Sequence, residues 1–260
     1  MTFKRISIVV IGCLATGACS SGSGGTAATP TPPPPPPPPP PVDQAMGGIW
    51  VGVLTNDMSQ TSELFVALAT DDGRFRFLSG ESGLQFVGTQ VINTTHIVGT
   101  GIGYADPAVP WLDASVVSDT STDGQLIERD SFSGIWSTAS GESGNFDLFY
   151  NDEYESPSSL SLLEGVWTAY DDFRNPTATF TIDAMGQFTG QNTSGCTSSG
   201  QISLIDDRYS MYDVTSTISN CFIAGDYSGL AITGELSVPN DAIILSISNT
   251  DRALVLGLEK

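Results

Sequence analysis

The chain has 260 residues, of which 29 are acidic and nine are basic, and its formal net charge is −20. A protein of this charge offers few Lys and Arg side chains to replace phosphate counterions, so we expect no nucleic acid partner. The sequence has 28 glycines and short apolar stretches without a long helical period. This pattern indicates strands joined by turns and predicts an all-β fold.

Residues 1–18 have the layout of a secretory signal, because Lys4 and Arg5 precede the apolar run 6–15 and small residues follow it. The run has about 10 residues, half of the roughly 20 that a membrane-spanning helix needs. The segment ends in "TGAC", which resembles the lipobox of bacterial lipoproteins. This resemblance implies cleavage before Cys19 and lipidation of its sulfur. An ordinary cleaved signal is the alternative.

Residues 19–45 form a tether, because a Gly/Ser stretch and the proline run Pro32–Pro41 cannot join a packed core. Ten prolines in the polyproline II conformation make a semi-rigid spacer of roughly 30 Å. A ligand for an aromatic groove is the alternative, but no basic residue flanks the run to orient a partner. In the lipoproteins that this segment resembles, an aspartate after the cysteine implies retention in the inner membrane. Ser20 occupies this position here, so we expect the outer membrane.

The folded part repeats one pattern, which starts at Trp50 and again at Trp167. We predict two related β units, at residues 46–150 and 164–260, joined by a turn-rich linker at residues 151–163. Short connections between alternating segments predict antiparallel meanders, and eight such strands can close into a small up-and-down barrel. A β-sandwich is the alternative. The first unit opens with Gly48–Thr55 and closes with Asn145–Tyr150, and its middle, residues 84–105, is less clearly punctuated. The strands predicted for the second unit are Gly165–Tyr170, Ala178–Ile182, Gln187–Gln191, Gly200–Ile205, Tyr209–Ile218, Tyr227–Leu236, Ala242–Ser248 and Arg252–Leu258.

A Gly-x-Trp motif on the first strand and a basic residue on the last strand resemble the calycin pattern of lipocalins and avidins. Gly165-Val166-Trp167 with Arg252 matches this pattern, and Gly48-Ile49-Trp50 matches its first half. The resemblance implies that Trp50 and Trp167 plug the barrel floors, with Arg252 above Trp167. The last strand of the first unit has no basic residue, and a third copy ending in Trp136 lies where the pattern expects none.

Cys196 and Cys221 are the only two cysteines after residue 19. In an exported chain, such a pair predicts a disulfide, which here closes a loop of about 25 residues and contributes on the order of 3 kcal/mol. The two residues fall in the connections before the fourth and after the fifth strand of the second unit.

No catalytic constellation is legible in the sequence. His96 is the only histidine, and we expect it in a solvent-facing loop. The two "SGESG" copies, with Ser82 and Ser143, lack the nucleophile elbow and are typical of hairpin turns. The carboxylates Asp152, Glu153 and Glu155 fall in the linker, where rigid positioning is not expected. We therefore expect no enzymatic activity and no cofactor.

Asp119, Asp123 and Asp130 are the candidate ligands of a metal site, because they have the spacing of a calcium-binding loop. The segment lacks the flanking helices and the bidentate glutamate of such loops. Thr122-Asp123-Gly124 also suits a plain hairpin turn, so we expect a turn and no metal.

The sequence therefore predicts a lipid-anchored outer-membrane protein with a non-catalytic binding or structural role, whose partner is an envelope protein or a small apolar ligand. One alternative is a carrier, which needs a pocket lined by Phe, Tyr and Trp. The other resembles the small lipid-anchored barrel inhibitors of proteases, which combine Gly-x-Trp with one disulfide. It needs a protruding segment, either before Gly47 or at Asn151–Leu163.

Overall fold

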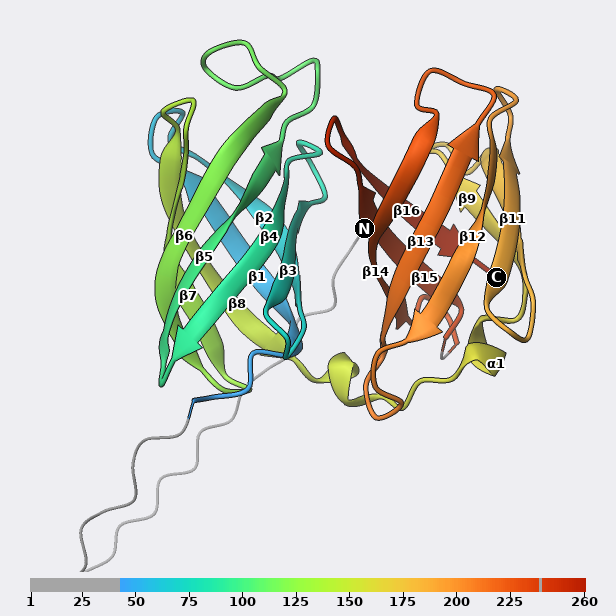
Figure 1. Cartoon of the computed structure of the whole chain (residues 1–260), viewed down its shortest axis with the longest axis horizontal. Helices are drawn as coiled ribbons and strands as arrows, with labels where there is room; N and C mark the ends of the chain where they lie inside the picture. The colour runs from blue at the N-terminus through green and yellow to red at the C-terminus, as the bar shows by residue number, and fades with distance from the viewer. Residues whose placement is uncertain (1–42, 239) are drawn as a thin grey trace, which may run out of the picture. The chain divides into compact units, whose positions relative to one another are not determined.

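Two antiparallel sheets contain most of the chain, and each closes on itself (Figure 1). The computed structural model describes residues 43–238 and 240–260. In each sheet, eight strands pair in chain order and the first strand pairs with the last. The prediction of two tandem eight-stranded up-and-down barrels is confirmed, and the β-sandwich alternative is wrong. Both barrels belong to one compact unit of the chain.

The first barrel closes through long, regular pairings. Strand β1 pairs with β2 from Gly48↔Ala69 to Asn56↔Thr61 and with β8 from Ile49↔Asn151 to Asn56↔Gly144. Its strands are β1 (Gly48–Asn56), β2 (Thr61–Ala69), β3 (Arg74–Ser79), β4 (Gln85–Asn93), β5 (His96–Tyr104), β6 (Val117–Ile127), β7 (Ser131–Thr138) and β8 (Ser143–Asn151).

The hairpin turn predicted at Thr122-Asp123-Gly124 is wrong, because β6 runs straight through this segment. Thr122 and Gly124 face the barrel interior, whereas Asp123 faces outward. Asp123 is paired on both sides, with Val98 of β5 and Ile135 of β7. Pairing with two neighbouring strands overrides the turn preference of Asp-Gly.

The linker contains two short helices and packs against the barrels. The 3-10 helix η1 (Asp152–Glu155) carries the buried Tyr154, and α1 (Leu160–Leu163) carries the buried Leu163. The backbone N–H of Ser158 donates to Asp207 O, and the N–H of Ser210 donates to Tyr154 O. This segment is therefore held along its length.

The second barrel has the predicted strands, with boundaries that differ by at most three residues. It extends from the linker to the end of the chain, and its connections are all short (Figure 1). Its strands are β9 (Gly165–Tyr170), β10 (Pro176–Ile182), β11 (Gln187–Asn192), β12 (Thr197–Leu204), β13 (Met211–Ser219), β14 (Gly225–Gly234), β15 (Ala242–Ser248) and β16 (Ala253–Glu259).

The seam between β9 and β16 is the thinnest junction of the second barrel. Within the described residues, these strands share one paired position, Glu259↔Thr168. Side chains reinforce it, because Arg174 donates to both carboxylate oxygens of Glu259 at 2.5 and 2.6 Å, and Lys260 Nζ donates to Leu162 O at 3.1 Å. Contacts of two cationic side chains thus supplement the sparse backbone pairing at this seam.

A third apolar cluster lies on the outer faces of the two barrels, where they contact each other. It contains Ile49, Leu68, Leu78, Tyr154, Met211, Leu230 and Ile232, all buried. The inward faces of the strands form the other two clusters, one in each barrel.

Arg76 crosses the junction between the barrels. Its guanidinium donates to Ser246 Oγ at 3.1 Å, to Ser248 Oγ at 3.1 Å and to Ser228 O at 2.7 Å. Arg76 is 6% exposed, and no carboxylate of the described residues lies within 4.0 Å of it. Burial lowers the pKa of the Arg76 guanidinium to about 10, so the group is charged at neutral pH. The junction thus solvates a buried cation with neutral oxygens.

We expect Arg76→Ala to lower the free energy of unfolding by about 2–4 kcal/mol, because it leaves a void and removes three hydrogen bonds, two of them to the buried hydroxyls of Ser246 and Ser248. The matched control is Arg74→Ala on the same face of β3. Arg74 is 38% exposed and pairs with Asp72 and Asp213, so its loss should cost about 1 kcal/mol or less. Urea denaturation measures both values, and equal losses would refute this role of Arg76.

Candidate functional site

Aromatic rings fill the interior of the first barrel. The ring centre of Phe77 lies 5.8 Å from that of Phe132 and 5.5 Å from that of Phe146, both edge-on. Trp111 enters from the connection between β5 and β6, and its ring centre lies 6.2 Å from that of Phe86. The buried rings of this interior are Trp50, Phe65, Phe75, Phe77, Phe86, Trp111, Phe132, Trp136 and Phe146.

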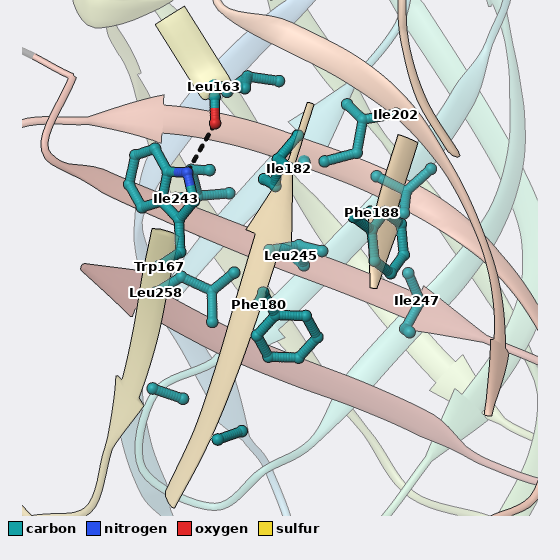
Figure 2. Packing of buried hydrophobic residues seen from close by; sticks show 14 of the residues in the cluster. Leu163, Trp167, Phe180, Ile182, Phe188, Ile202, Ile243, Leu245, Ile247 and Leu258 are labelled. Atoms are coloured by element: carbon teal, nitrogen blue, oxygen red, sulfur yellow. Dashed lines mark hydrogen bonds between the residues drawn. The ribbon is translucent and has the colours of Figure 1, made fainter. Parts of the chain in front are cut away.

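At one end of the second barrel, Trp167 lies beside the linker helix (Figure 2). Trp167 is fully buried, and its indole N–H donates to Leu163 O at 2.7 Å. Aliphatic side chains complete this floor. They are Ile182, Ile202, Ile243 and Leu258, and each is at most 2% exposed.

The basic residue above Trp167 is Lys260, so the predicted role of Arg252 is wrong. Lys260 Nζ lies 4.9 Å from the centre of the Trp167 ring, whereas the Arg252 guanidinium lies 6.0 Å from the ring of Phe222. The reason is strand length. Seven residues of β16 span about 20 Å, so residues before and after this strand lie at opposite ends of the barrel.

Trp50 occupies the corresponding place at the start of β1. It is fully buried, and its ring meets Tyr150 and Phe132 edge-on at centre distances of 5.2 and 6.0 Å. Its indole N–H has no hydrogen-bond partner in the described chain, unlike that of Trp167. Trp50 and Trp167 of the two Gly-x-Trp motifs that open the barrels are therefore both buried, as is Trp136 of the third copy. The first barrel places rings instead of a cation beside Trp50.

The end of the second barrel opposite Trp167 contains a cavity of about 160 Å³. Phe180, Leu245 and Ile247 form part of its wall (Figure 2). Val255 of β16, which is exposed, also contributes to the lining. The other lining residues are Ala178, Phe188, Gln191, Asn192, Cys196, Thr197, Ser198, Ser216, Ile218, Ile223, Leu254 and Leu256.

Two glycines explain why the phenylalanines leave this space open. A Cβ at Gly190 would lie 2.4 Å from Cδ1 of Phe180, and a Cβ at Gly200 would lie 2.6 Å from Cζ of Phe188. Each phenylalanine ring therefore packs directly against a glycine of the barrel sheet, in the space that a Cβ at this glycine would occupy. The rings line the cavity instead of crossing it.

The predicted disulfide between Cys196 and Cys221 is confirmed, with a Cα–Cα distance of 5.1 Å. It joins the β11–β12 connection to the β13–β14 connection at the open end of the barrel. Cys196 and Ile223, which follows the second cysteine by two positions, both line the cavity. The disulfide thus holds together two parts of the cavity rim.

We expect the double variant Cys196→Ala/Cys221→Ala to lose about 3 kcal/mol of folding free energy, because the unfolded chain regains the freedom of a loop of about 25 residues. Guanidinium denaturation under non-reducing conditions measures this loss. The parent chain should lose a similar amount in reductant, whereas the double variant should not respond to reductant. A variant as stable as the parent would contradict this role.

The candidate metal ligands Asp119, Asp123 and Asp130 do not form a metal site in the described chain. Asp119 and Asp123 lie on the outer face of β6, and Asp130 lies in the following turn. Within residues 43–238 and 240–260, no group of three His, Cys, Asp or Glu side chains could hold a metal ion. His96 begins β5 rather than lying in a loop, and its Nε2 lies 2.9 Å from Asp123 Oδ1 at the surface.

The remaining candidates for catalytic residues, the serines of "SGESG" and the linker carboxylates, lie at turns and in surface contacts. The two "SGESG" copies connect β3 to β4 and β7 to β8, as predicted. In the linker, Glu155 accepts from the Tyr150 hydroxyl at 2.6 Å and lies 3.1 Å from Arg129 Nε.

Cys19, the candidate for lipidation, lies outside the described residues. The two helices of the described chain have four residues each and are too short to cross a membrane.

Comparison with known proteins identifies no family. No family model matches the chain, and no curated protein matches it. Among solved structures, a Bacteroides fragilis NCTC 9343 protein named as a putative outer membrane protein is similar at a TM-score of 0.31 and 11% identity. The match covers 84% of this chain and 100% of that protein. A similarity of this size carries no inference about function.

Proposed function

We propose that this chain is a non-catalytic, lipid-anchored binding protein of the cell envelope, whose second barrel holds a small apolar group. The observation that carries the proposal is the cavity in the second barrel. Its wall is mostly aliphatic and aromatic, and its lining contains no Asp, Glu, His, Lys or Arg. Such a lining favours binding over acid–base or nucleophilic chemistry.

The cavity volume limits the size of the ligand. An apolar cavity of roughly 150 Å³ lined by Leu, Ile and Phe is known to stay dry and to bind benzene. The present cavity, at about 160 Å³, suits a ligand body of similar size. Removal of a ligand's apolar surface from water supplies roughly 25 cal/mol per Å², so even a ring of this size gains useful affinity.

The disulfide supports a location outside the cytoplasm, because such bonds persist in oxidising compartments. Residues 1–45 support lipid anchoring at the outer membrane by their resemblance to a lipoprotein signal and tether. The alternative of a protease inhibitor needs a protruding segment, and one of the two candidate segments does not protrude. Tyr154, Ser158 and Leu163 of Asn151–Leu163 are all buried, so this segment does not protrude into a protease cleft.

Benzene is the probe that tests the cavity. We expect it to bind the purified chain and to raise its stability by about 2.7 kcal/mol at a hundredfold excess over Kd. Ala178→Leu places three more carbons in the cavity and should weaken binding by about tenfold or more. Isothermal titration calorimetry measures the affinity, and chemical denaturation measures the stabilisation.

The matched control is Thr179→Leu, because Thr179 is the next residue of β10 and faces outward. This variant should bind benzene as the parent does. Equal weakening by both variants would show that added bulk on β10 perturbs the fold. Unchanged binding by Ala178→Leu would place benzene elsewhere.

Cys19→Ser tests the proposed anchor. The parent chain should incorporate radiolabelled fatty acid and sediment with outer membranes, whereas Cys19→Ser should be unlabelled and soluble in the periplasm. Cys13→Ser is the control, because Cys13 lies within the predicted signal and should not be needed for labelling. Labelling of Cys19→Ser at the parent level would contradict lipidation at this residue.

A further inference from the structure

One hydroxyl is buried in the wall of the otherwise mostly apolar cavity. Ser216 lies on β13, is 6% exposed and lines the cavity. It is paired with Gly200 of β12 on one side and with Tyr227 of β14 on the other. Within the part of the chain that the structure describes, its hydroxyl makes no hydrogen bond. Ser216 Oγ is not among the fully buried side-chain atoms that lack a partner, so it can be reached from the cavity and can pair with a bound molecule in place of water.

The other polar groups of the lining are engaged or lie closer to the rim. Asn192 Oδ1 accepts from the backbone N–H groups of Ser194 at 3.0 Å and Cys196 at 2.9 Å. Thr197 Oγ1 accepts from Asn220 Nδ2 at 2.9 Å. The side chain of Ser198 is only partly buried, and Gln191 is exposed. Ser216 is therefore the buried polar group that remains available to a bound molecule.

The lining also limits the charge of the ligand. No cationic side chain lines the cavity to balance a carboxylate or phosphate, and no anionic side chain lines it to balance an amine. Transfer of an unpaired charge into such a site costs far more than the available contacts return. The ligand must be neutral in the part that enters the barrel.

We propose that Ser216 hydrogen-bonds the single polar group of a neutral ligand, such as a phenol, an alcohol or a ketone with a small apolar body. This inference rests on the proposed function, since it specifies the ligand of the same cavity. The hydroxyl of Ser216 can donate to a carbonyl or an ether oxygen and accept from a hydroxyl. It would thus distinguish such compounds from hydrocarbons of the same shape.

The test compares benzene, phenol and benzoate as probes of the full purified chain. Calorimetric titration gives the affinity ratio of phenol to benzene for the parent, for Ser216→Ala and for Ser216→Thr. We expect Ser216→Ala to lower this ratio about fivefold to tenfold, the usual worth of one hydrogen bond. Ser216→Thr keeps the hydroxyl and should keep most of the ratio. Ser199→Ala, on the outer face of β12, is the control and should leave the ratio unchanged.

Three results would overturn the inference. If the ratio is the same in Ser216→Ala as in the parent, Ser216 does not contact the polar group, although the cavity still binds apolar compounds. If benzoate binds as tightly as phenol, the cavity does not select neutral ligands. If neither benzene nor phenol binds the parent, the proposed function fails as well. Thermal unfolding of each variant shows whether it is folded.

Discussion

Closure of an eight-stranded sheet sets the space that inward-facing side chains must fill, and the rest of this structure depends on that constraint. The first barrel meets it with large rings, including three tryptophans, Trp50, Trp111 and Trp136. The second barrel uses one tryptophan at the floor and small residues such as Ala178 and Ser216 at the other end. The two units thus share a topology, but one has a solid aromatic interior and the other keeps a cavity.

The junction between the barrels adds a second constraint, because Arg76 buries a charge among oxygens of the other barrel. Desolvation makes such an arrangement costly unless every oxygen is well placed. Ser246 is fully buried there and also donates to Gln85 Oε1 of the first barrel at 3.3 Å. These hydrogen bonds require oxygens at defined positions around Arg76, whereas contacts between apolar side chains have no such directional requirement.

Most of the fold could be predicted from the sequence, because alternation and short turns are local signals. The strand boundaries of the second barrel, the disulfide and the buried Trp50 and Trp167 all follow from such signals. The turn predicted at Asp123 was wrong, because the turn preference of Asp-Gly is visible in the local sequence, whereas the pairing of Asp123 with two neighbouring strands is not. Lys260 and Arg76 were missed because their partners are distant in sequence. No short sequence pattern predicts the cavity. Once the strand pairing is known, however, the small residues at 190, 198, 200 and 216 are seen to share the inward face that borders it.

The seam between β9 and β16 has a consequence for the rate at which the cavity exchanges its contents. A sheet opens first where its backbone pairing is sparse. Here one paired position, the Arg174–Glu259 ion pair and the Lys260–Leu162 hydrogen bond hold the strands. Leu254 and Leu256 of β16 lie on one side of that seam, Ala178 and Phe180 lie beyond it on β10, and all four line the cavity. Transient separation at this edge would open the cavity from the side. The residence time of a bound molecule would then be governed by the frequency of this opening, and it would shorten as salt screens the exposed ion pair.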